Sequence, residues 1–208
     1  MMHEKTLYRA VDTLAGRHRE IRAIVSTYGN PPLWGREPGF CSLVYTILEQ
    51  QVSLASARAV YRKLQAKTGG LSPEKFLRLS DDELRSIGFS RQKIAYCRNV
   101  ASLILENELD LAALEEQTDQ DAQTVLMGIK GIGRWTAEIY LLHSLGRPDI
   151  WPASDLALQI GYQEALNLPQ RPDENELDRF GVQYAPWRSA AARVFWHFYI
   201  EKRNLKLA

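Results

Sequence analysis

Apolar residues recur at helical spacing along most of the chain. In residues 4–27, for example, Leu7, Val11 and Leu14 fall on one face, which is typical of an amphipathic helix. Capping residues and glycines mark the ends of further expected helices. These are expected over residues 40–51, 53–67, 80–88, 118–127, 134–145 and 186–203, with two more beginning at Ser90 and near Asp155. No alternating pattern favours strands, so the sequence predicts an all-α fold.

Composition narrows the class of protein. Of the 208 residues, 45% are hydrophobic and 25% are charged, which is ordinary for a globular protein with its own core. The two cysteines, Cys41 and Cys97, have no ligand spacing around them, so we expect neither a zinc nor an iron–sulfur site. The first residues are too polar for a signal peptide, and no apolar run is long enough for a membrane span. We therefore expect a cytoplasmic protein without membrane contact, associated with the nucleoid if bacterial.

Charge is balanced overall but unevenly distributed. The formal net charge of +1 gives no support for a nucleic-acid partner. Residues 106–121 carry seven acids and no base, whereas residues 188–206 carry five bases against the single acid Glu201. This asymmetry permits one cationic face, but on charge alone ordinary solvated helix surfaces are the simpler interpretation.

A glycine-rich turn between two helices is the most informative segment. Residues 126–137 read LMGIKGIGRWTA, so Gly131 and Gly133 directly precede a helix. Glycine permits a positive φ, and a helix N-terminus attracts anions such as a DNA phosphate. Lys130 and Arg134 would add positive charge beside it. The alternatives are a plain tight turn, or a dinucleotide-binding turn, which would require a preceding strand and a third glycine.

Asp155 is the carboxylate best placed in the sequence to take part in a reaction. It follows Pro152 and precedes an apolar helix start, where a helix N-terminus favours an ionised carboxylate by about 0.3–1 kcal/mol. Such an anion can stabilise positive charge developing on a deoxyribose and can activate water. The simpler interpretation is a helix N-cap, with Ser154 as the competing cap, and the two roles can coexist.

Four ordered segments together resemble the helix-hairpin-helix DNA glycosylases with a Gly/Pro-rich loop and a catalytic Asp. The 3-methyladenine DNA glycosylase II family is the most similar branch, and the resemblance covers roughly residues 40–203. The segments are ILEQQVS at 47–53, GFSxxK at 88–93, GIKGIGRWTAEIYLL with WPASD between 128 and 155, and PWRS at 186–189. The resemblance implies one glycosylase domain over residues 1–208 with a cleft between two helical lobes. The central lobe would span about 40–150 and contain the hairpin 126–137, and residues 1–39 and 151–208 would form the other.

The resemblance also implies a role for individual residues. Asp155 would be catalytic, and the aromatic walls of a pocket for a flipped base would include Trp196 and Trp135. The family's pocket Tyr is replaced by Ile139, and the adjacent Tyr140 is turned by about 100° on a helix. The full expected pocket set is Trp196, Trp135, Tyr140 and Gln50. The expected DNA-contacting set is Gln51, which would fill the gap left by the flipped base, with Lys130, Gly131, Gly133, Arg134 and Thr136.

Departures from related branches refine this expectation. Bifunctional glycosylase/lyases carry a nucleophilic Lys at the position of Trp135, so the resemblance implies a monofunctional enzyme that uses water. The four-cysteine iron–sulfur loop and the extra N-terminal domain of larger relatives are not expected here. Oxidised guanine and mismatched adenine are disfavoured as lesions, whereas ethenoadenine and hypoxanthine remain alternatives to alkylated purines. A non-catalytic DNA-binding module remains the alternative from another class.

Cofactor and partner expectations follow from the same resemblance. No cofactor is expected for catalysis. A structural Na⁺ or K⁺ is expected at the hairpin, bound by the backbone carbonyls of Met127, Ile129 and Ile132. The expected partner is double-stranded DNA containing damaged bases, bound by a monomer. His143 and His197 are expected to be structural or surface residues, because neither has a partner at catalytic spacing.

Overall fold

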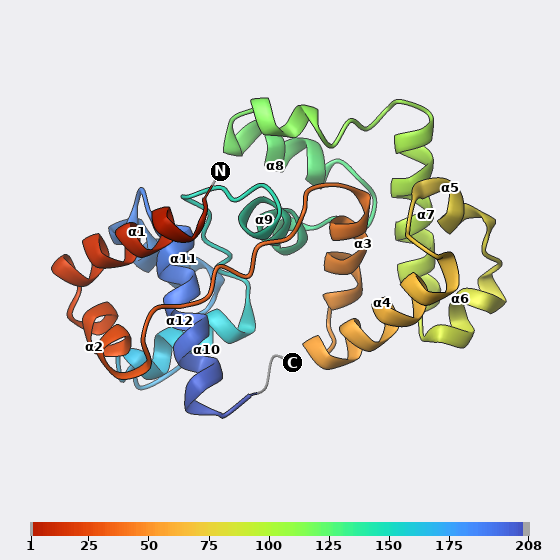
Figure 1. Ribbon diagram of the computed structural model, residues 1–208. Coiled ribbons are helices and arrows are strands. Elements are labelled where there is room, and N and C mark those ends of the chain that lie inside the picture. The colour runs from red at the N-terminus through yellow and green to blue at the C-terminus, as the bar shows by residue number, and fades with distance from the viewer. Residues whose placement is uncertain (1, 206–208) are drawn as a thin grey trace. The chain divides into compact units, whose positions relative to one another are not determined.

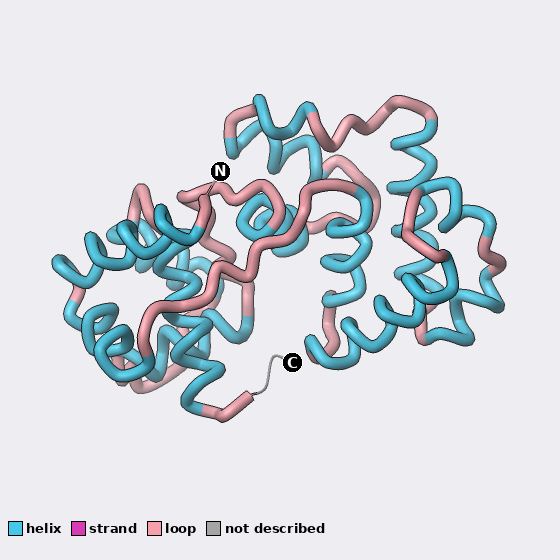
Figure 2. Tube along the Cα trace, viewed as in Figure 1, coloured by secondary structure: helices cyan, strands magenta, loops and turns pink. Residues whose placement is uncertain are grey.

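The computed structural model describes residues 2–205, and within them the chain is entirely helical. These residues form twelve α-helices and two 3-10 helices, with no strand (Figures 1 and 2). The all-α prediction is therefore confirmed. The chain divides into two compact units. Unit 1 contains the described residues up to Gly35 and from Leu141 onward, and unit 2 spans Arg36–Tyr140. The division falls inside α9 (Arg134–His143).

Unit 1 is built around α12 (Arg188–Lys202), against which α1, α2 and α10 all pack. Every residue of α12 from Ser189 to His197 is buried, so this helix is covered on all sides. A helix that is enclosed in this way forms the centre of a core rather than its edge. The other helices of unit 1 are α1 (Glu4–Arg17), α2 (Arg19–Tyr28), α10 (Leu156–Ala165), α11 (Glu174–Gly181) and the 3-10 helix η2 (Val182–Tyr184).

The expectation of one long helix over residues 4–27 is wrong, because the chain breaks at His18. This residue adopts an extended conformation with φ −122° and ψ 113°, and it separates α1 from α2. Its ring lies 4.8 Å from that of Tyr184, measured between centroids. Arg22 stabilises the break by donating to the carbonyls of Ala15 and Gly16. The turn allows both helices to pack against α12 as well as against each other.

The described arginines and lysines of the C-terminal stretch all have partners within unit 1, and one of them is buried. Arg193 is 1% exposed and donates to the carbonyl oxygens of Leu33, Leu142 and Ser189. It therefore connects the loop after α2, the end of α9 and the start of α12. Desolvation by burial lowers its pKa to about 10, so the guanidinium remains charged near neutrality. Lys206 lies outside the described residues.

The remaining bases of this stretch form ion pairs. Arg188 makes two hydrogen bonds of 2.8 Å with the carboxylate of Asp149. Lys202 and Arg203 both pair with Glu164 of α10, and this pairing lowers the pKa of the Glu164 carboxyl. These charges hold α12 against its neighbours in unit 1.

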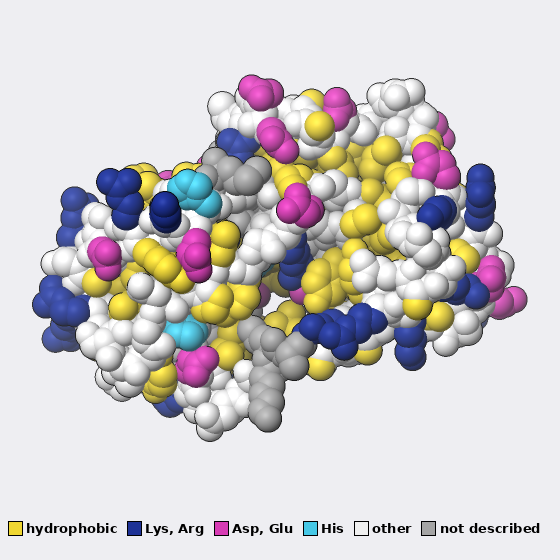
Figure 3. All heavy atoms as spheres, in the orientation of Figure 1, with side chains coloured by type: hydrophobic (Ala, Val, Ile, Leu, Met, Phe, Trp, Pro, Cys, Tyr) yellow, Lys and Arg dark blue, Asp and Glu magenta, His cyan; other side chains and the backbone are white. Residues whose placement is uncertain are grey.

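Unit 2 is centred on α7, which contacts α3, α5 and α6, while α4 packs on α3 and α6. Its elements are α3 (Phe40–Glu49), α4 (Leu54–Thr68), α5 (Pro73–Arg78), α6 (Asp81–Ile87), α7 (Arg91–Leu105), η1 (Ala113–Glu116) and α8 (Asp119–Met127). The sequence did not predict α5, α11 or η1. Figure 3 shows Asp and Glu side chains gathered over the part of unit 2 that contains α8, where the acidic run 106–121 lies.

The capping residues of unit 2 act as the sequence predicts. Ser53, Ser80 and Ser90 each accept a hydrogen bond from a backbone N–H in the first turn of the helix that follows. The backbone N–H of Ser80 donates in return to the Glu83 carboxylate, which completes a capping box. Gly88 ends α6 with φ +112°, and a Cβ there would lie 2.8 Å from Val60. A glycine is therefore needed for close packing of this turn on α4.

Candidate functional site

Asp155 is held at the start of α10 by two hydrogen bonds. It is the N-cap residue of that helix, and its Oδ1 accepts from the backbone N–H of Leu158 at 2.8 Å. The same oxygen accepts from the indole Nε1–H of Trp196 at 2.9 Å. The N-cap role is taken by Asp155 rather than Ser154. Two N–H donors on one oxygen of this half-buried carboxylate fix its direction.

Trp196 links this carboxylate to a histidine that sequence reasoning set aside. The Trp196 side chain is 7% exposed and belongs to α12. The ring of His143 stacks against it, with centroids 5.5 Å apart and planes 19° apart. His143 is oriented in turn by a 2.9 Å hydrogen bond between its Nδ1 and the carbonyl oxygen of Trp34. No spacing in the sequence could identify this contact, because it joins α9 to α12.

The loop before Asp155 is fastened to the rest of unit 1. Trp151 donates its indole N–H to the carbonyl of Leu177 at 2.9 Å. Gly181 passes so close to this indole that a Cβ would lie 2.4 Å from it. Gln159 reaches back from α10 to the carbonyl of Ala153 at 2.8 Å. The backbone on both sides of Asp155 is therefore fixed by packing and hydrogen bonds, which a directed carboxylate requires.

Of the two hairpin glycines expected to allow a positive φ, Gly131 and Gly133, only the first adopts one. Gly131 has φ +98°, and a Cβ there would lie 2.2 Å from the ring of Tyr96. A glycine is therefore needed at this position both for the positive φ of the turn and for the close contact with Tyr96 of α7. Gly133 has no positive φ and faces open space, so its backbone conformation does not require a glycine. Its carbonyl accepts the first helical bond of α9, from the N–H of Ala137.

The other expected DNA-contacting residues of the hairpin divide into exposed and internal ones. Lys130 is exposed, as a phosphate contact requires. Arg134 already forms an ion pair within α9, since its Nε donates to the buried Glu138 at 2.9 Å. Thr136 is 2% exposed and its hydroxyl accepts a hydrogen bond from Gln50. Its side chain therefore cannot contact DNA as expected.

Gln50 and Gln51 follow α3 and behave differently. The Gln50 amide donates to the carbonyl of Gly131 at 3.0 Å and to the hydroxyl of Thr136 at 2.9 Å. It therefore joins the end of α3 to the hairpin. Gln51 is exposed and adopts a left-handed conformation with φ +55°. This conformation is uncommon for a residue with a side chain and is concentrated at functional sites.

Trp135 and Tyr140, the two aromatic residues of α9 expected to line the pocket, differ in how far they are buried. Trp135 is half-buried in the first turn of the helix. Tyr140 has no exposed surface, and its hydroxyl accepts from the backbone N–H of Gly39 at 2.9 Å. Burial raises the Tyr140 pKa to about 12. Tyr140 thus belongs to the core of unit 2 and has no face for a base, as the one-residue offset on the helix suggested. His197 is also internal, with Nε2 3.0 Å from the carbonyl oxygen of Tyr28.

Candidate cation ligands are confined to the backbone. Among the described residues, no group of three His, Cys, Asp or Glu side chains could hold a metal ion. Met127 ends α8, and the carbonyl of Ile129 accepts from the N–H of Ile132 at 3.0 Å within the turn. Such carbonyl oxygens suit a hard cation rather than zinc or iron. Within residues 2–205, no helix is long and apolar enough to cross a membrane.

Known proteins resemble this chain over nearly its whole length. A DNA-3-methyladenine glycosylase from Schizosaccharomyces pombe is 28% identical over 199 residues, which is 92% of this chain and 87% of the relative. The solved structure of an S. pombe 3-methyladenine DNA glycosylase in complex with abasic DNA matches with a TM-score of 0.85 at 27% identity, covering 94% of this chain and 97% of that one. A DNA-3-methyladenine glycosidase from Bacillus halodurans matches with a TM-score of 0.76 at 30% identity, covering 95% and 91%.

The family assignment rests on a match to a family profile. The profile of the HhH-GPD superfamily of base excision DNA repair proteins matches residues 44–185, a range that includes the end of α3, the glycine hairpin and Asp155. This range is well over half of the 208 residues. The chain therefore belongs to the HhH-GPD superfamily of base excision DNA repair proteins.

Proposed function

We propose that this protein is a monofunctional DNA glycosylase that hydrolyses the N-glycosidic bond of alkylated purines such as 3-methyladenine and 7-methylguanine. The observation that carries the proposal is the carboxylate of Asp155, held by the N–H groups of Trp196 and Leu158. The names of the relatives, 3-methyladenine glycosylases from fungi and bacteria, support the choice of lesion. Within that group we propose the type II class, as the sequence motifs imply.

Asp155 would act on the sugar rather than on the base. Cleavage of an N-glycosidic bond builds positive charge on the deoxyribose, and a fixed anion stabilises that charge. The same carboxylate can orient or deprotonate the water that attacks the sugar carbon. The bond between sugar and base breaks with its electron pair leaving on the base. An alkylated purine is already cationic, so it departs as a neutral base without a general acid.

A monofunctional reaction follows from the residue at the start of α9. Trp135 lies where lyase relatives have a nucleophilic lysine, and an indole cannot form a Schiff base with the sugar. The product is therefore an abasic site with an intact strand. Trp135 and Trp196 are proposed to contact the flipped base, because an electron-poor ring stacks well on indole.

Unit 2 supplies the proposed DNA contacts. The start of α9, with Gly131 and Gly133, would bind a backbone phosphate, and the exposed Lys130 would add charge. Gln51 would enter the duplex where the target base has left it, and Gln50 would lie beside the pocket. These contacts read no sequence, which suits an enzyme that must scan any DNA.

Two further assignments belong to this proposal. A monovalent cation at the carbonyls of Met127, Ile129 and Ile132 would neutralise their dipoles in the hairpin and would take no part in the chemistry. The protein would act as a monomer on duplex DNA in the cytoplasm.

The experiment uses methylated genomic DNA and the purified protein. Released bases are separated and counted, and strand breaks are measured without added alkali. Release of 3-methyladenine with intact strands is expected. DNA binding without any base release would instead favour a non-catalytic DNA-binding module, and release only from ethenoadenine or hypoxanthine DNA would change the lesion.

A further inference from the structure

The short loop between α3 and α4 presents Gln51 in a conformation that must be held. This loop, residues 50–53, is four residues long and runs from the end of α3 at Glu49 to the N-cap Ser53. Gln51 has φ +55° and is exposed, as are Val52 and Ser53. A left-handed residue with a side chain persists only where its surroundings fix it. The contacts around the loop therefore determine how far Gln51 projects.

Leu48 and Glu49 at the end of α3, and Gln50 just after it, each form hydrogen bonds with another segment of unit 2. Gln50 bonds to the hairpin through its amide. Glu49, which is 5% exposed, accepts two hydrogen bonds of 2.8 and 2.6 Å from Arg36. Leu48 is fixed through its carbonyl oxygen, which accepts from the ammonium of Lys93 at 2.7 Å.

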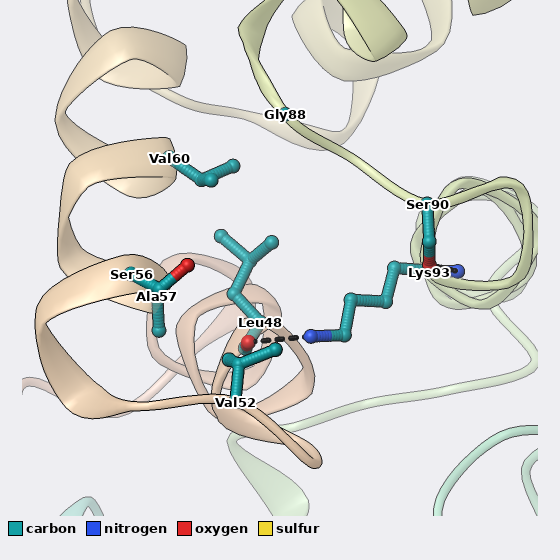
Figure 4. Close-up of a pocket in the computed structure, with 8 residues that line it drawn as sticks. All are labelled: Leu48, Val52, Ser56, Ala57, Val60, Gly88, Ser90 and Lys93. Carbon is teal, nitrogen blue, oxygen red and sulfur yellow. Dashed lines mark hydrogen bonds between the residues drawn. The ribbon is translucent and has the colours of Figure 1, made fainter.

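The contact of Lys93 differs from the other two because it crosses a cavity. Behind the loop lies a pocket of about 100 Å³. Figure 4 shows Lys93 reaching from α7 across this space to the end of α3. The pocket is lined by Leu48, Val52, Ser56, Ala57, Val60, Gly88, Ser90 and Lys93. Burial in these largely apolar surroundings lowers the pKa of the Lys93 ammonium.

An ammonium at this place completes the end of a helix. The last carbonyls of a helix have no partner within it, and a cation there also interacts favourably with the helix dipole. Without Lys93, the Leu48 carbonyl would face a cavity in which Val52, one residue beyond Gln51, already forms part of the wall. The loop would then have room to move inward, toward the cavity and away from bound DNA.

We propose that Lys93 is a positioning residue that holds the loop 50–53 outward, so that Gln51 reaches into the duplex when the target base is flipped. This inference rests on the proposed function, because it assigns to Lys93 the support of the residue that fills the gap. Lys93 does not contact DNA or the reacting atoms. It acts through the carbonyl of Leu48 and hence through the backbone that leads to Gln51.

The test compares Lys93→Met with Gln51→Ala and with the double variant. Each is assayed under single-turnover conditions on a duplex containing one alkylated purine and on the same lesion strand without its complement. Lys75→Met is the matched control, because the Lys75 ammonium also donates to a backbone carbonyl beyond a helix end, that of Gly69 at 3.2 Å. Melting temperature and circular dichroism establish that each variant is folded.

Lys93→Met is expected to slow excision from the duplex about tenfold, the effect of one lost charged hydrogen bond on the barrier to flipping. Excision from the single strand, which needs no gap filled, is expected to be unchanged. The double variant is expected to be no slower than Gln51→Ala, because both changes remove the same contribution. Lys93→Arg, which keeps the cation, is expected to recover most of the duplex rate.

Three results would overturn the inference: an unchanged duplex rate, an equal loss on both substrates, or losses that multiply in the double variant. If Lys93→Met does not fold, Lys93→Gln replaces it with the same expected outcomes. A binding assay separates this inference from the proposed function. 2-Aminopurine placed beside an abasic site in duplex DNA is expected to brighten on binding of the wild type and less so with Lys93→Met, whether or not any base is released. Equal brightening by both proteins would also refute the role of Lys93.

Discussion

Trp196 donates its indole N–H to Oδ1 of Asp155 over 2.9 Å, across 41 positions of sequence. The tryptophan therefore does more than offer a ring to the base, since it also holds the carboxylate proposed to carry the chemistry. The second donor to the same oxygen is the N–H of Leu158, within the helix that Asp155 begins. Chain segments from α10 and α12 thus meet at one carboxylate oxygen, and these two helices also pack against each other in unit 1.

Trp196→Phe separates these two roles, because it keeps an aromatic ring and removes the N–H. We expect single-turnover excision to slow about tenfold, because a hydrogen bond to a charged group is lost. Trp151→Phe is the control, since that indole bonds the carbonyl of Leu177 in the same unit. It is expected to lower the melting temperature and leave the excision rate within about twofold of wild type. A wild-type rate for Trp196→Phe would mean that its hydrogen bond does not assist the reaction.

Asp155 is expected to contribute to stability as well as to chemistry. Because it caps α10, Asp155→Ala is expected to lower the free energy of unfolding by about 1 kcal/mol. Asp155→Asn retains a good capping side chain and is expected to cost only a few tenths. Urea unfolding followed by circular dichroism measures both. Equal stability of the two variants would contradict the capping role.

The two hairpin glycines are expected to respond differently to alanine. Gly131→Ala must accommodate a methyl group where Tyr96 lies and a positive φ, so we expect a loss of about 2 kcal/mol or more in stability. Gly133→Ala meets open space and is expected to fold normally. Its methyl group would lie at the proposed phosphate site, so the affinity for duplex DNA is expected to fall. Thermal melts and fluorescence anisotropy distinguish the two cases, and the reverse pattern would refute this explanation.

Arg193 is expected to be a structural residue of unit 1. Arg193→Met removes donors from three backbone carbonyls, and at about 1 kcal/mol for each we expect a loss near 3 kcal/mol. Arg62→Met, a change at an exposed arginine of α4, is the control and is expected to leave stability unchanged. Chemical denaturation provides both values. A small effect at Arg193 would mean that water replaces the guanidinium readily.

Local signals in the sequence predicted most of the helices of this fold. The caps at Ser53, Ser80 and Ser90 were readable because a hydroxyl and its helix lie within a few positions of each other. The break at His18 was not readable, because neither this residue nor either neighbour is a glycine or proline, and its ring contacts Tyr184, far along the chain. The short helices α5 and α11 were missed, since six and eight residues give too few turns for a periodic pattern.

The candidate site shows the same division between local and distant contacts. The turn at Gly131 and the capping position of Asp155 were predictable from neighbouring residues. The stacking of His143 on Trp196 was not, because residue type alone does not say which rings meet. The contact of Lys93 with Leu48 was equally hidden, although Lys93 belongs to a recognised motif. Sequence indicates which residues have suitable chemistry, and tertiary packing decides which of them work together.

The most direct test of the proposed chemistry is the release of 3-methyladenine from methylated DNA by the wild type and by Asp155→Asn. Asp12→Asn, a change at an exposed carboxylate of α1, is the matched control. We expect wild type and Asp12→Asn to release the base at equal rates, with strands intact, and Asp155→Asn to fall by at least about a hundredfold while remaining folded and able to bind DNA. Base release by Asp155→Asn at the wild-type rate would contradict the catalytic role of this carboxylate.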